Sequence, residues 1–197
     1  MLKKSYPYIV AIIVFIAVTL VYFSPLLEGK KMRQSDIVHF QGMSKEISDY
    51  RAKTGKEALW TNNMFGGMPA YQISVVYKGN LVKQVDKVLK LGLPHPADLV
   101  FLYMLGFFIL ALVLGVNVWL AIAGAIAFAF SSYFFIIFEA GHNSKAHAIA
   151  YMAPVLAGII LTMRKKYLLG GALTALFLAL ELYANHLQIT YYLLMIV

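Results

Sequence analysis

The chain has 197 residues, of which 61% are hydrophobic and 13% are charged, and it contains no cysteine. Soluble domains are about half apolar and about a quarter charged, so this composition excludes an ordinary soluble domain and indicates an integral membrane protein. Disulfides, thiolate nucleophiles and cysteine-ligated metals are excluded as well. The net charge of +8 comes from basic residues beside apolar runs, which favours anionic lipid headgroups over nucleic acid as the partner.

The N-terminal segment is predicted to be an uncleaved transmembrane helix. Lys3 and Lys4 precede an apolar run over residues 7–27, and a helix needs about 20 apolar residues to cross the hydrocarbon core of a bilayer. The run is longer than the apolar region of a signal peptide, and no cleavage pattern follows it. A transmembrane helix is therefore favoured over a signal peptide.

Residues 28–98 are polar and are predicted to form one large loop outside the membrane. Apolar residues recur every three or four positions over residues 36–53, which predicts an amphipathic helix. A second amphipathic pattern covers residues 80–91, where lysines oppose the apolar stripe, as in helices that lie in the membrane interface. Between the two helices, residues 60–69 form a turn-rich segment with aromatic residues that can anchor it.

The rest of the chain alternates apolar runs with short connections. It predicts an all-α integral membrane protein of about five to six transmembrane helices, with a large outer loop that carries amphipathic interfacial helices. The predicted spans cover residues 7–27, 99–114, 118–138, 148–163, 167–184 and 187–197, the last of them truncated. We therefore expect residues 1–197 to be a single N-terminal part of the transmembrane domain of a longer protein. Small residues over 121–129, with Gly124, would let a neighbouring helix approach closely.

The basic residues of the short connections predict the orientation of the chain. If Lys3 and Lys4 are cytoplasmic, strict alternation of the spans places the cluster at residues 164–166 on the cytoplasmic side too. The N-terminus is then cytoplasmic and the large loop faces outward. With this topology all five histidines fall at or near the outer side, and short inner connections explain much of that count.

The first polar junction, Gln34-Ser35-Asp36, follows the first span and opens an amphipathic helix. Ser35 or Asp36 would be a good N-cap, because a side-chain oxygen there can accept an orphan backbone N–H. A carboxylate held at the membrane surface could instead act as a general base or as a ligand of a hard cation. From the residues alone, capping is the favoured interpretation.

The second junction lies at the outer end of the third span and is rich in polar residues for a connection between two apolar helices. It contains Glu139, His142, Asn143, Lys145 and His147. Glu139 and His142 would share a face of a helix, a spacing compatible with two metal ligands, although it is no zinc signature. Lys145 could bind a lipid-linked phosphate as a point charge, and an ordinary solvated loop is the structural alternative.

The third junction contains Glu181, Asn185 and His186. Glu181 lies well inside its predicted helix, where an ionisable group is costly and is usually paired or functional. Lys145 and His142 are candidate partners, so structural pairing and a substrate-binding role both remain open. The middles of the predicted helices hold almost no polar residues, which makes a pore or carrier the weaker interpretation.

Several separated motifs of this chain resemble YfhO-type bacterial membrane proteins, in the form found in Bacteroidetes-like bacteria. The motifs are RQSD at 33–36, LWTN at 59–62, MFGGMPAY at 64–71, FEAGHN at 138–143, KAH at 145–147, NH at 185–186 and QITYY at 188–192. The resemblance extends over essentially the whole sequence. It implies a GT-C-like glycosyltransferase fold, in which a large outer loop with membrane-lying helices follows the first span.

The resemblance implies an enzyme that takes a sugar from a polyprenyl-phosphate carrier and places it on a cell-envelope glycan or polymer on the outer face of the bacterial inner membrane. An acidic residue early in the outer loop is the usual catalytic candidate in such folds, and Asp36 is the position that fits. Asp36 would deprotonate an acceptor hydroxyl or help to hold a divalent cation, the only cofactor expected. Lys145, with His142 or His147, would neutralise charge on the lipid phosphate.

The substrate-binding residues that follow from these junctions are Glu139, His142, Asn143, Lys145, His147, Glu181, Asn185 and His186. The rival function is a non-catalytic membrane protein that binds lipid-linked envelope intermediates, and a lipid or solute carrier is the weaker third alternative. Membrane lipids are expected partners in each case, and nucleic acid is not.

Overall fold

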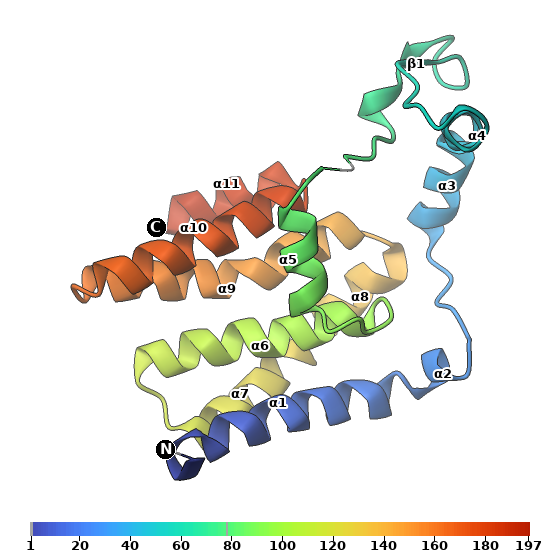
Figure 1. Ribbon diagram of the computed structural model, residues 1–197. Coiled ribbons are helices and arrows are strands. Elements are labelled where there is room, and N and C mark those ends of the chain that lie inside the picture. Colours follow the sequence, from blue (N-terminus) through green and yellow to red (C-terminus); the bar gives the residue numbers. More distant parts are fainter. Residues whose placement is uncertain (1, 78) are drawn as a thin grey trace. The chain divides into compact units, whose positions relative to one another are not determined.

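The computed structural model describes residues 2–77 and 79–197, with side chains from residue 5 onward (Figure 1). The side chains of Lys3 and Lys4, which orient the chain in the prediction above, therefore lie outside the described part. The chain divides into two compact units. The bundle unit contains the residues up to Lys31, Leu81–Phe138 and His142–Val197, and the loop unit contains Met32–Asn80 and Glu139–Gly141.

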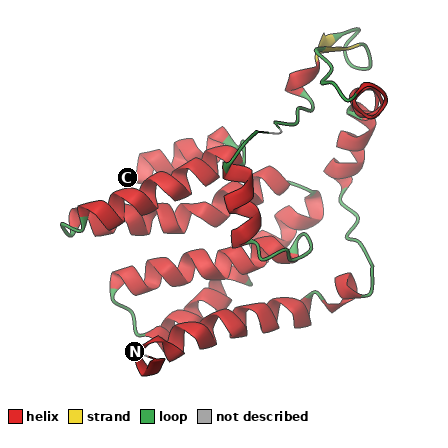
Figure 2. Ribbon diagram, in the orientation of Figure 1, coloured by secondary structure: helices red, strands yellow, loops and turns green. Residues whose placement is uncertain are grey.

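Helices make up nearly all of the bundle unit (Figure 2). They are α1 (Leu2–Tyr22), α2 (Ser24–Leu27), α5 (Val82–Leu89), α6 (Ala97–Leu114), α7 (Val118–Ala129), α8 (Ser132–Ala140), α9 (Asn143–Met163), α10 (Tyr167–Tyr183) and α11 (Leu187–Ile196). The last two residues of α8 belong to the loop unit.

Three of these helices, α1, α6 and α9, are long and apolar enough to cross a membrane. Helices α7 and α8 make up to a fourth span, with a bend of 41° at the break between them. Helices α10 and α11 are apolar but shorter. The structure thus confirms a helical protein with several helices that are long and apolar enough to cross a membrane, and the number of five to six spans stays a prediction.

Helix α6 forms the centre of the bundle because it is apolar on all sides, and such a helix is stable only when it is surrounded. It packs against α1, α7 and α9, and Figure 1 shows it between α1 and α9. The ring of Tyr103 stacks on Phe134 with centroids 4.1 Å apart, and its hydroxyl donates a 2.8 Å hydrogen bond to the carbonyl oxygen of Ala146. This bond satisfies the one polar atom of an otherwise apolar core position.

Helices α9 and α10 meet at a pair of glycines, each four residues before a threonine. A Cβ added at Gly158 would lie 2.6 Å from the backbone nitrogen of Thr174, and one added at Gly170 would lie 2.6 Å from the carbonyl oxygen of Gly158. The threonine hydroxyls stay satisfied, because Thr162 donates to the Gly158 carbonyl and Thr174 to the Gly170 carbonyl. Small residues four apart allow helices in a membrane to pack backbone to backbone.

The small-residue stretch singled out in the sequence makes a looser contact. A Cβ added at Gly124 would lie 3.3 Å from the Phe107 ring, so only a side chain is near. A closer approach occurs at Gly106, where an added Cβ would lie 2.9 Å from the carbonyl oxygen of Ala150. Pro154 has no N–H to pair with that carbonyl. Helix α9 nevertheless runs through Pro154 unbroken, with the α6 backbone packed against this turn.

The loop unit contains α3 (Ser35–Met43), α4 (Lys45–Thr54), β1 (Trp60–Thr61), β2 (Met68–Pro69) and the short 3₁₀ helix η1 (Ala70–Gln72). The single helix predicted over residues 36–53 is thus two helices, which break at Ser44. Ile47 of α4 is fully buried and anchors this part of the unit. The strands pair antiparallel around the glycine-rich turn of residues 62–67.

We predict that Gly170→Val destabilises the bundle by about 1–3 kcal/mol, because the new side chain would collide with the α9 backbone. Gly171→Val is the matched control, since a Cβ at Gly171 meets nothing within 4 Å. Thermal unfolding of the two purified variants in detergent measures the difference. Equal melting temperatures for both variants would contradict the close packing of α9 on α10.

Candidate polar network at the ends of α5, α6 and α9

The best-connected polar site of the bundle unit is centred on Asp86 of α5, whose side chain is only 7% exposed. Its Oδ1 atom accepts hydrogen bonds from His147 Nε2 at 2.6 Å and from the Tyr151 hydroxyl at 2.5 Å. Its Oδ2 atom accepts from Lys90 Nζ at 2.9 Å. These partners fasten α5 to the first half of α9, because His147 and Tyr151 lie one turn apart on the same face of that helix.

Lys90 extends the network to the start of α6. Its Nζ lies 3.5 Å from Oδ2 of Asp98, a buried residue in the first turn of α6. A carboxylate there also benefits from the positive end of the helix dipole. His95 continues the chain of contacts, with Nδ1 3.1 Å from Asp98 Oδ1 and Nε2 3.0 Å from Asn143 Oδ1. The network therefore joins α5 to the N-terminal ends of both α6 and α9.

The contacts of His95 define two protonation patterns. Both of its partners, the Asp98 carboxylate and the Asn143 amide oxygen, are hydrogen-bond acceptors. A ring that donates to both carries two protons and a positive charge. A neutral ring fits equally well if the Asn143 amide is rotated so that its NH₂ group faces Nε2. In either case His95 links the two helix ends.

The Asp86 carboxyl is held in its charged form. Burial raises its pKa, but the hydrogen bonds from His147, Tyr151 and Lys90 and the charge of His147 outweigh burial, and the net effect lowers the pKa well below its usual range. A carboxylate that accepts several donors is stabilised in this way. Asp86 is therefore a fixed negative charge on an otherwise basic helix, rather than a group that exchanges protons near neutral pH.

Helix α5 presents a different surface from the one that its sequence pattern predicts. Lys90 turns toward Asp86 and Asp98, whereas the apolar side chains of Leu81 and Val88 are exposed. Lys87 is exposed as well. Exposed apolar side chains beside a lysine are typical of a helix that lies in a membrane interface. The prediction of an interfacial helix is thus consistent with this surface. The inner side of the helix holds the buried Asp86 together with Val82 and Leu89, which pack partly buried on the core.

The proposed catalytic residue Asp36 belongs to the loop unit. The N-cap of α3 is Gln34, whose side chain makes no capping hydrogen bond, so Ser35 and Asp36 lie inside the first turn and the capping interpretation was wrong. The Ser35 hydroxyl instead donates a 3.2 Å hydrogen bond to the carbonyl oxygen of Ala140. Asp36 is exposed, and its Cβ would lie 3.1 Å from a Cβ added at Gly141.

The second junction is split by the end of a helix. Helix α8 ends at Ala140, Gly141 has a φ of +94°, and α9 begins after His142. Glu139 and His142 therefore do not share one helical face as the predicted metal pair requires. Asn143 and His147 join the Asp86 network, whereas the ammonium group of Lys145 lies over the Tyr133 ring, 5.4 Å from its centroid.

The third junction gives a buried carboxyl group. Glu181 of α10 is 0% exposed, and the Thr190 side chain of α11 is its polar neighbour. The candidate partners Lys145 and His142 thus do not pair with it. Nearby in the sequence, Asn185 adopts the left-handed conformation that separates α10 from α11. His186 follows as the N-cap residue of α11, and its Nδ1 atom is buried without a partner.

Asp86, Lys90, His95, Asp98 and Tyr151 were not among the predicted site residues. Two signals in the sequence point to them. Asp86 is the single acid on a basic amphipathic helix and stands four residues before Lys90, the spacing of a helical ion pair. Asp98 immediately precedes an apolar run, where a helix N-terminus favours an acid. No signal of this kind marks Tyr151, which reads as an ordinary core residue.

In the part of the chain that the structure describes, no group of three or more His, Asp or Glu side chains is arranged to hold a metal ion. No family model matches the chain, and no curated protein or solved structure is significantly similar to it. The resemblance to YfhO-type proteins stays a prediction from the motifs.

We predict that acidification weakens the wild-type protein more than Asp86→Asn. The folded state keeps the pKa of Asp86 below its value in the unfolded chain, which is about 3.9. As the pH falls below about 4, the unfolded state therefore binds more protons than the folded state. The stability that the Asp86 charge contributes is complete above this pH and is lost below it. At pH 7 the Asn variant should be less stable by about 1–3 kcal/mol, because its partners lose a charged acceptor.

Thermal unfolding in detergent at several pH values between 7 and 3 measures this effect. Asp49→Asn is the control, because Asp49 forms an exposed ion pair with Lys45. A wild-type protein and an Asp86→Asn variant that lose stability in parallel on acidification would show that Asp86 is not the charged centre of the network.

Proposed function

We propose that this protein is a membrane glycosyltransferase-like enzyme of GT-C type, which moves a sugar from a polyprenyl-phosphate carrier to a cell-envelope glycan or polymer acceptor. The motif resemblance supports the reaction class. The observation that carries the proposal is the exposed carboxylate of Asp36, which the first turn of α3 and the close approach of Gly141 hold in place within the loop unit.

The placement of Asp36 suits a general base. Such a base must be reachable by the substrate hydroxyl and must also be held in a defined position. Asp36 is exposed, while the Ser35 hydroxyl bonds the turn of residues 139–141 to the start of α3. The glycine at position 141 allows this contact, because a Cβ there would also come within 3.3 Å of the Ile37 nitrogen.

The bundle unit offers groups that suit an anionic lipid carrier. Helix α5 exposes apolar side chains beside Lys87, a combination that attracts anionic headgroups to a membrane surface. At the start of α9, Lys145 supplies a positive charge in the first turn. His147 is less suited to binding the phosphate than predicted, because its Nε2 atom is bound to Asp86. We therefore assign the phosphate to Lys145 and His142.

The proposed chemistry is an inverting transfer. Asp36 removes the proton from an acceptor hydroxyl, whose oxygen attacks the anomeric carbon of the donor sugar. The bond between that carbon and the phosphate oxygen breaks, and polyprenyl phosphate leaves with the negative charge. Positive groups near the leaving phosphate lower the barrier by stabilising this charge. A divalent cation would add to that stabilisation.

The proposal includes a topology. The N-terminus is cytoplasmic, five to six helices cross the bacterial inner membrane, and the loop of residues 28–98 lies outside, where lipid-linked sugars are used. The basic cluster at residues 164–166 on the opposite side supports this orientation. A non-catalytic protein that binds lipid-linked envelope intermediates would need the same surfaces but no base at Asp36.

The proposal predicts that Asp36→Asn abolishes sugar transfer, because an amide cannot accept the hydroxyl proton. Inner-membrane vesicles that contain the protein are supplied with radiolabelled polyprenyl-phosphate sugars, and label in the envelope fraction is counted. A loss of at least about a hundredfold is expected, within the usual range for removing a general base. Asp49→Asn, which removes another exposed acid of the same unit, should leave transfer unchanged.

Equal transfer by wild type and Asp36→Asn would remove Asp36 from the reaction. Binding of the labelled lipid without transfer by the wild type would favour the non-catalytic alternative. Equal amounts of each variant in the membrane, measured by immunoblot, ensure that insertion is not the cause of a loss.

We further predict that Gly141→Ala reduces transfer by about ten- to a hundredfold, since small displacements of a catalytic group have effects of this size. The new methyl group would crowd Asp36 and strain a backbone whose φ is +94°. Gly115→Ala is the matched control. Gly115 also has a positive φ, of +90°, but a Cβ there meets nothing within 4 Å. Similar losses in both variants would mean that general strain, rather than contact with Asp36, is responsible.

A further inference from the structure

The loop unit contains a cleft whose residues have no assigned role in the proposed reaction so far. It lies between α4 and the segment leading into β1, and its volume is 480 Å³, within the range of small-molecule binding sites. The side chains that matter for its chemistry are Glu46, Tyr50, Lys56, Glu57 and Trp60. Two aromatic rings and two carboxylates thus line one hollow.

The indole ring of Trp60 is held in place by a glycine. A Cβ added at Gly67 would lie 2.9 Å from two atoms of the ring, so only a glycine lets the turn lie against it. Trp60 is nevertheless 56% exposed, and Tyr50 on the facing helix is 45% exposed. Two partly open aromatic rings are therefore present at the cleft, one of them fixed by the backbone.

Glu46 is fixed as well. Its Oε2 atom accepts hydrogen bonds from the Thr61 hydroxyl at 2.5 Å and from the backbone N–H groups of Asn62 and Asn63 at 3.0 Å each. The hydrogen bond from Thr61, with those from the two backbone groups, outweighs burial and lowers the pKa of Glu46. All of these bonds fall on one oxygen, and Oε1 has no hydrogen-bond partner in the described residues.

The charges around the cleft balance. Arg51 binds Glu57 through two N–H groups, from Nε to Oε1 at 2.9 Å and from Nη2 to Oε2 at 2.8 Å. Glu46 and Lys56 supply one further charge of each sign. A site for a phosphate or another anion would carry an excess of positive charge, and a cation site an excess of negative charge. The balance favours a neutral ligand that can accept and donate hydrogen bonds.

We propose that this cleft binds a neutral saccharide. A sugar ring has one face of C–H groups, which packs well against the electron-rich face of an aromatic ring, and a rim of hydroxyl groups. Trp60 and Tyr50 would contact the C–H face, while Glu46 Oε1 would accept a hydroxyl proton in a charge-assisted hydrogen bond. We assign this cleft as the acceptor site of sugar transfer, which rests on the proposed function. The acceptor is then a neutral glycan.

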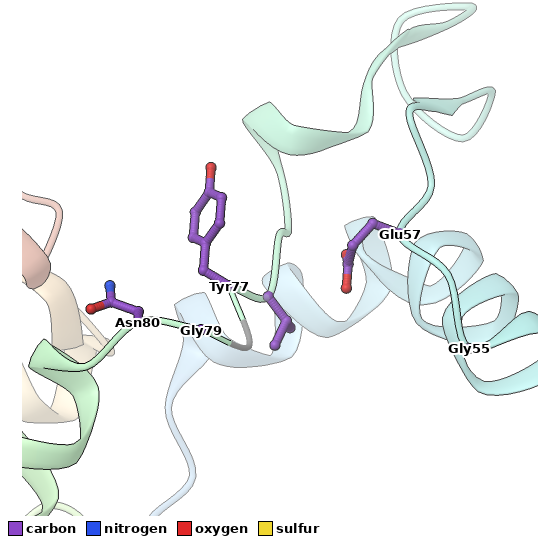
Figure 3. A pocket seen from close by; sticks show the side chains of 6 residues that line it. Gly55, Glu57, Tyr77, Gly79 and Asn80 are labelled. Carbon is purple, nitrogen blue, oxygen red and sulfur yellow. The ribbon is translucent and has the colours of Figure 1, made fainter.

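A second hollow beside the cleft supports an oligosaccharide over a single sugar. Its volume is 610 Å³, and it is lined by Gly55, Glu57, Val76, Tyr77, Gly79 and Asn80. Glu57 lines both hollows. Figure 3 shows Glu57 and Tyr77 on separate segments, with side chains that point in different directions, so the hollow is open. A chain of sugars that leaves the cleft past Glu57 has room to continue.

The alternative is that these aromatic residues contact the membrane surface. Phe65, at the turn between the strands, is 89% exposed and does not line the cleft. If the unit inserted aromatic side chains into the interface, Phe65 would be the first to enter it. Substitutions of Trp60 and Phe65 therefore distinguish saccharide binding from membrane contact, because only Trp60 belongs to the saccharide site.

The test measures saturation-transfer NMR from the whole protein in nanodiscs to maltotriose and to chitotriose, both neutral trisaccharides. Nanodiscs replace maltoside detergents, whose headgroups would compete. We expect saturation transfer to at least one of the two trisaccharides, with a dissociation constant in the millimolar range. Trp60→Ala and Tyr50→Ala should each weaken binding at least about tenfold, and Trp60→Phe should restore much of it. Phe65→Ala should change binding less than about twofold.

The proposal would be overturned if neither trisaccharide received saturation transfer, or if binding survived in Trp60→Ala. A loss of binding in Phe65→Ala as large as that in Trp60→Ala would also overturn it and point to membrane contact. Asp36→Asn keeps the cleft intact, so it should bind the trisaccharides normally even where sugar transfer is lost. Normal sugar transfer without trisaccharide binding would leave the proposed function in place but would show that this cleft is not its acceptor site.

Discussion

The buried charge of Asp86 is the constraint on which the arrangement of the bundle unit depends. Moving a carboxylate out of water costs several kcal/mol unless donors replace the lost hydration. Three donors from two helices do so here: His147 and Tyr151 on α9, and Lys90 on α5 itself. These contacts hold one side of α5 toward the bundle. On that side Asp86 is buried and Val82 and Leu89 pack partly buried on the core, whereas Leu81 and Val88 stay exposed.

The same bundle holds a second buried carboxyl, Glu181, which lies beside the Thr190 side chain and has no charged partner in the described residues. The contrast between the two acids is instructive. Asp86 lies outside the candidate spans, at the end where α6 and α9 begin with polar residues, whereas Glu181 lies within an apolar helix. An acid inside a membrane helix without a charged partner is costly. The charge of Asp86 is therefore balanced by His147 and Lys90, whereas the neighbour of Glu181 is the uncharged Thr190.

Much of the fold could be predicted from hydropathy, because a run of about 20 apolar residues has few alternatives to a membrane helix. The ends of α6 and α9 and the break between α10 and α11 follow the predicted pattern closely, whereas α9 begins at Asn143, five residues before the predicted span, so that the polar residues 143–147 belong to its first turns. The contacts between elements could not be predicted in this way. Asp86 and His147 are 61 residues apart, and they meet only because α5 packs beside α10, within reach of the side chains of α9. The side of α5 that faces the bundle could not be predicted either, because helical periodicity identifies an apolar stripe but not the helix that covers it.

The surroundings of the candidate site residues could not be predicted for similar reasons. His147 and Asn143 do take part in a polar cluster, although their partners were unforeseen. Glu139 and His142 are separated by the turn at Gly141, since a glycine with a positive φ ends the helix that was assumed to join them. The tight α9–α10 contact involves Gly158 and Gly170 rather than the small-residue stretch around Gly124. Spacing along one helix predicts neighbours on that helix, but not partners across a packed interface.

The central claim is that the loop unit faces outward, where lipid-linked sugars are used, and cysteine accessibility tests it most directly. The chain has no cysteine, so a single introduced thiol is labelled without background. Ser48→Cys in the loop unit and Tyr167→Cys after the basic cluster both replace exposed residues. In spheroplasts, a membrane-impermeant maleimide should label Ser48→Cys, and it should label Tyr167→Cys only after permeabilisation. The reverse pattern would place the loop unit in the cytoplasm and contradict the account.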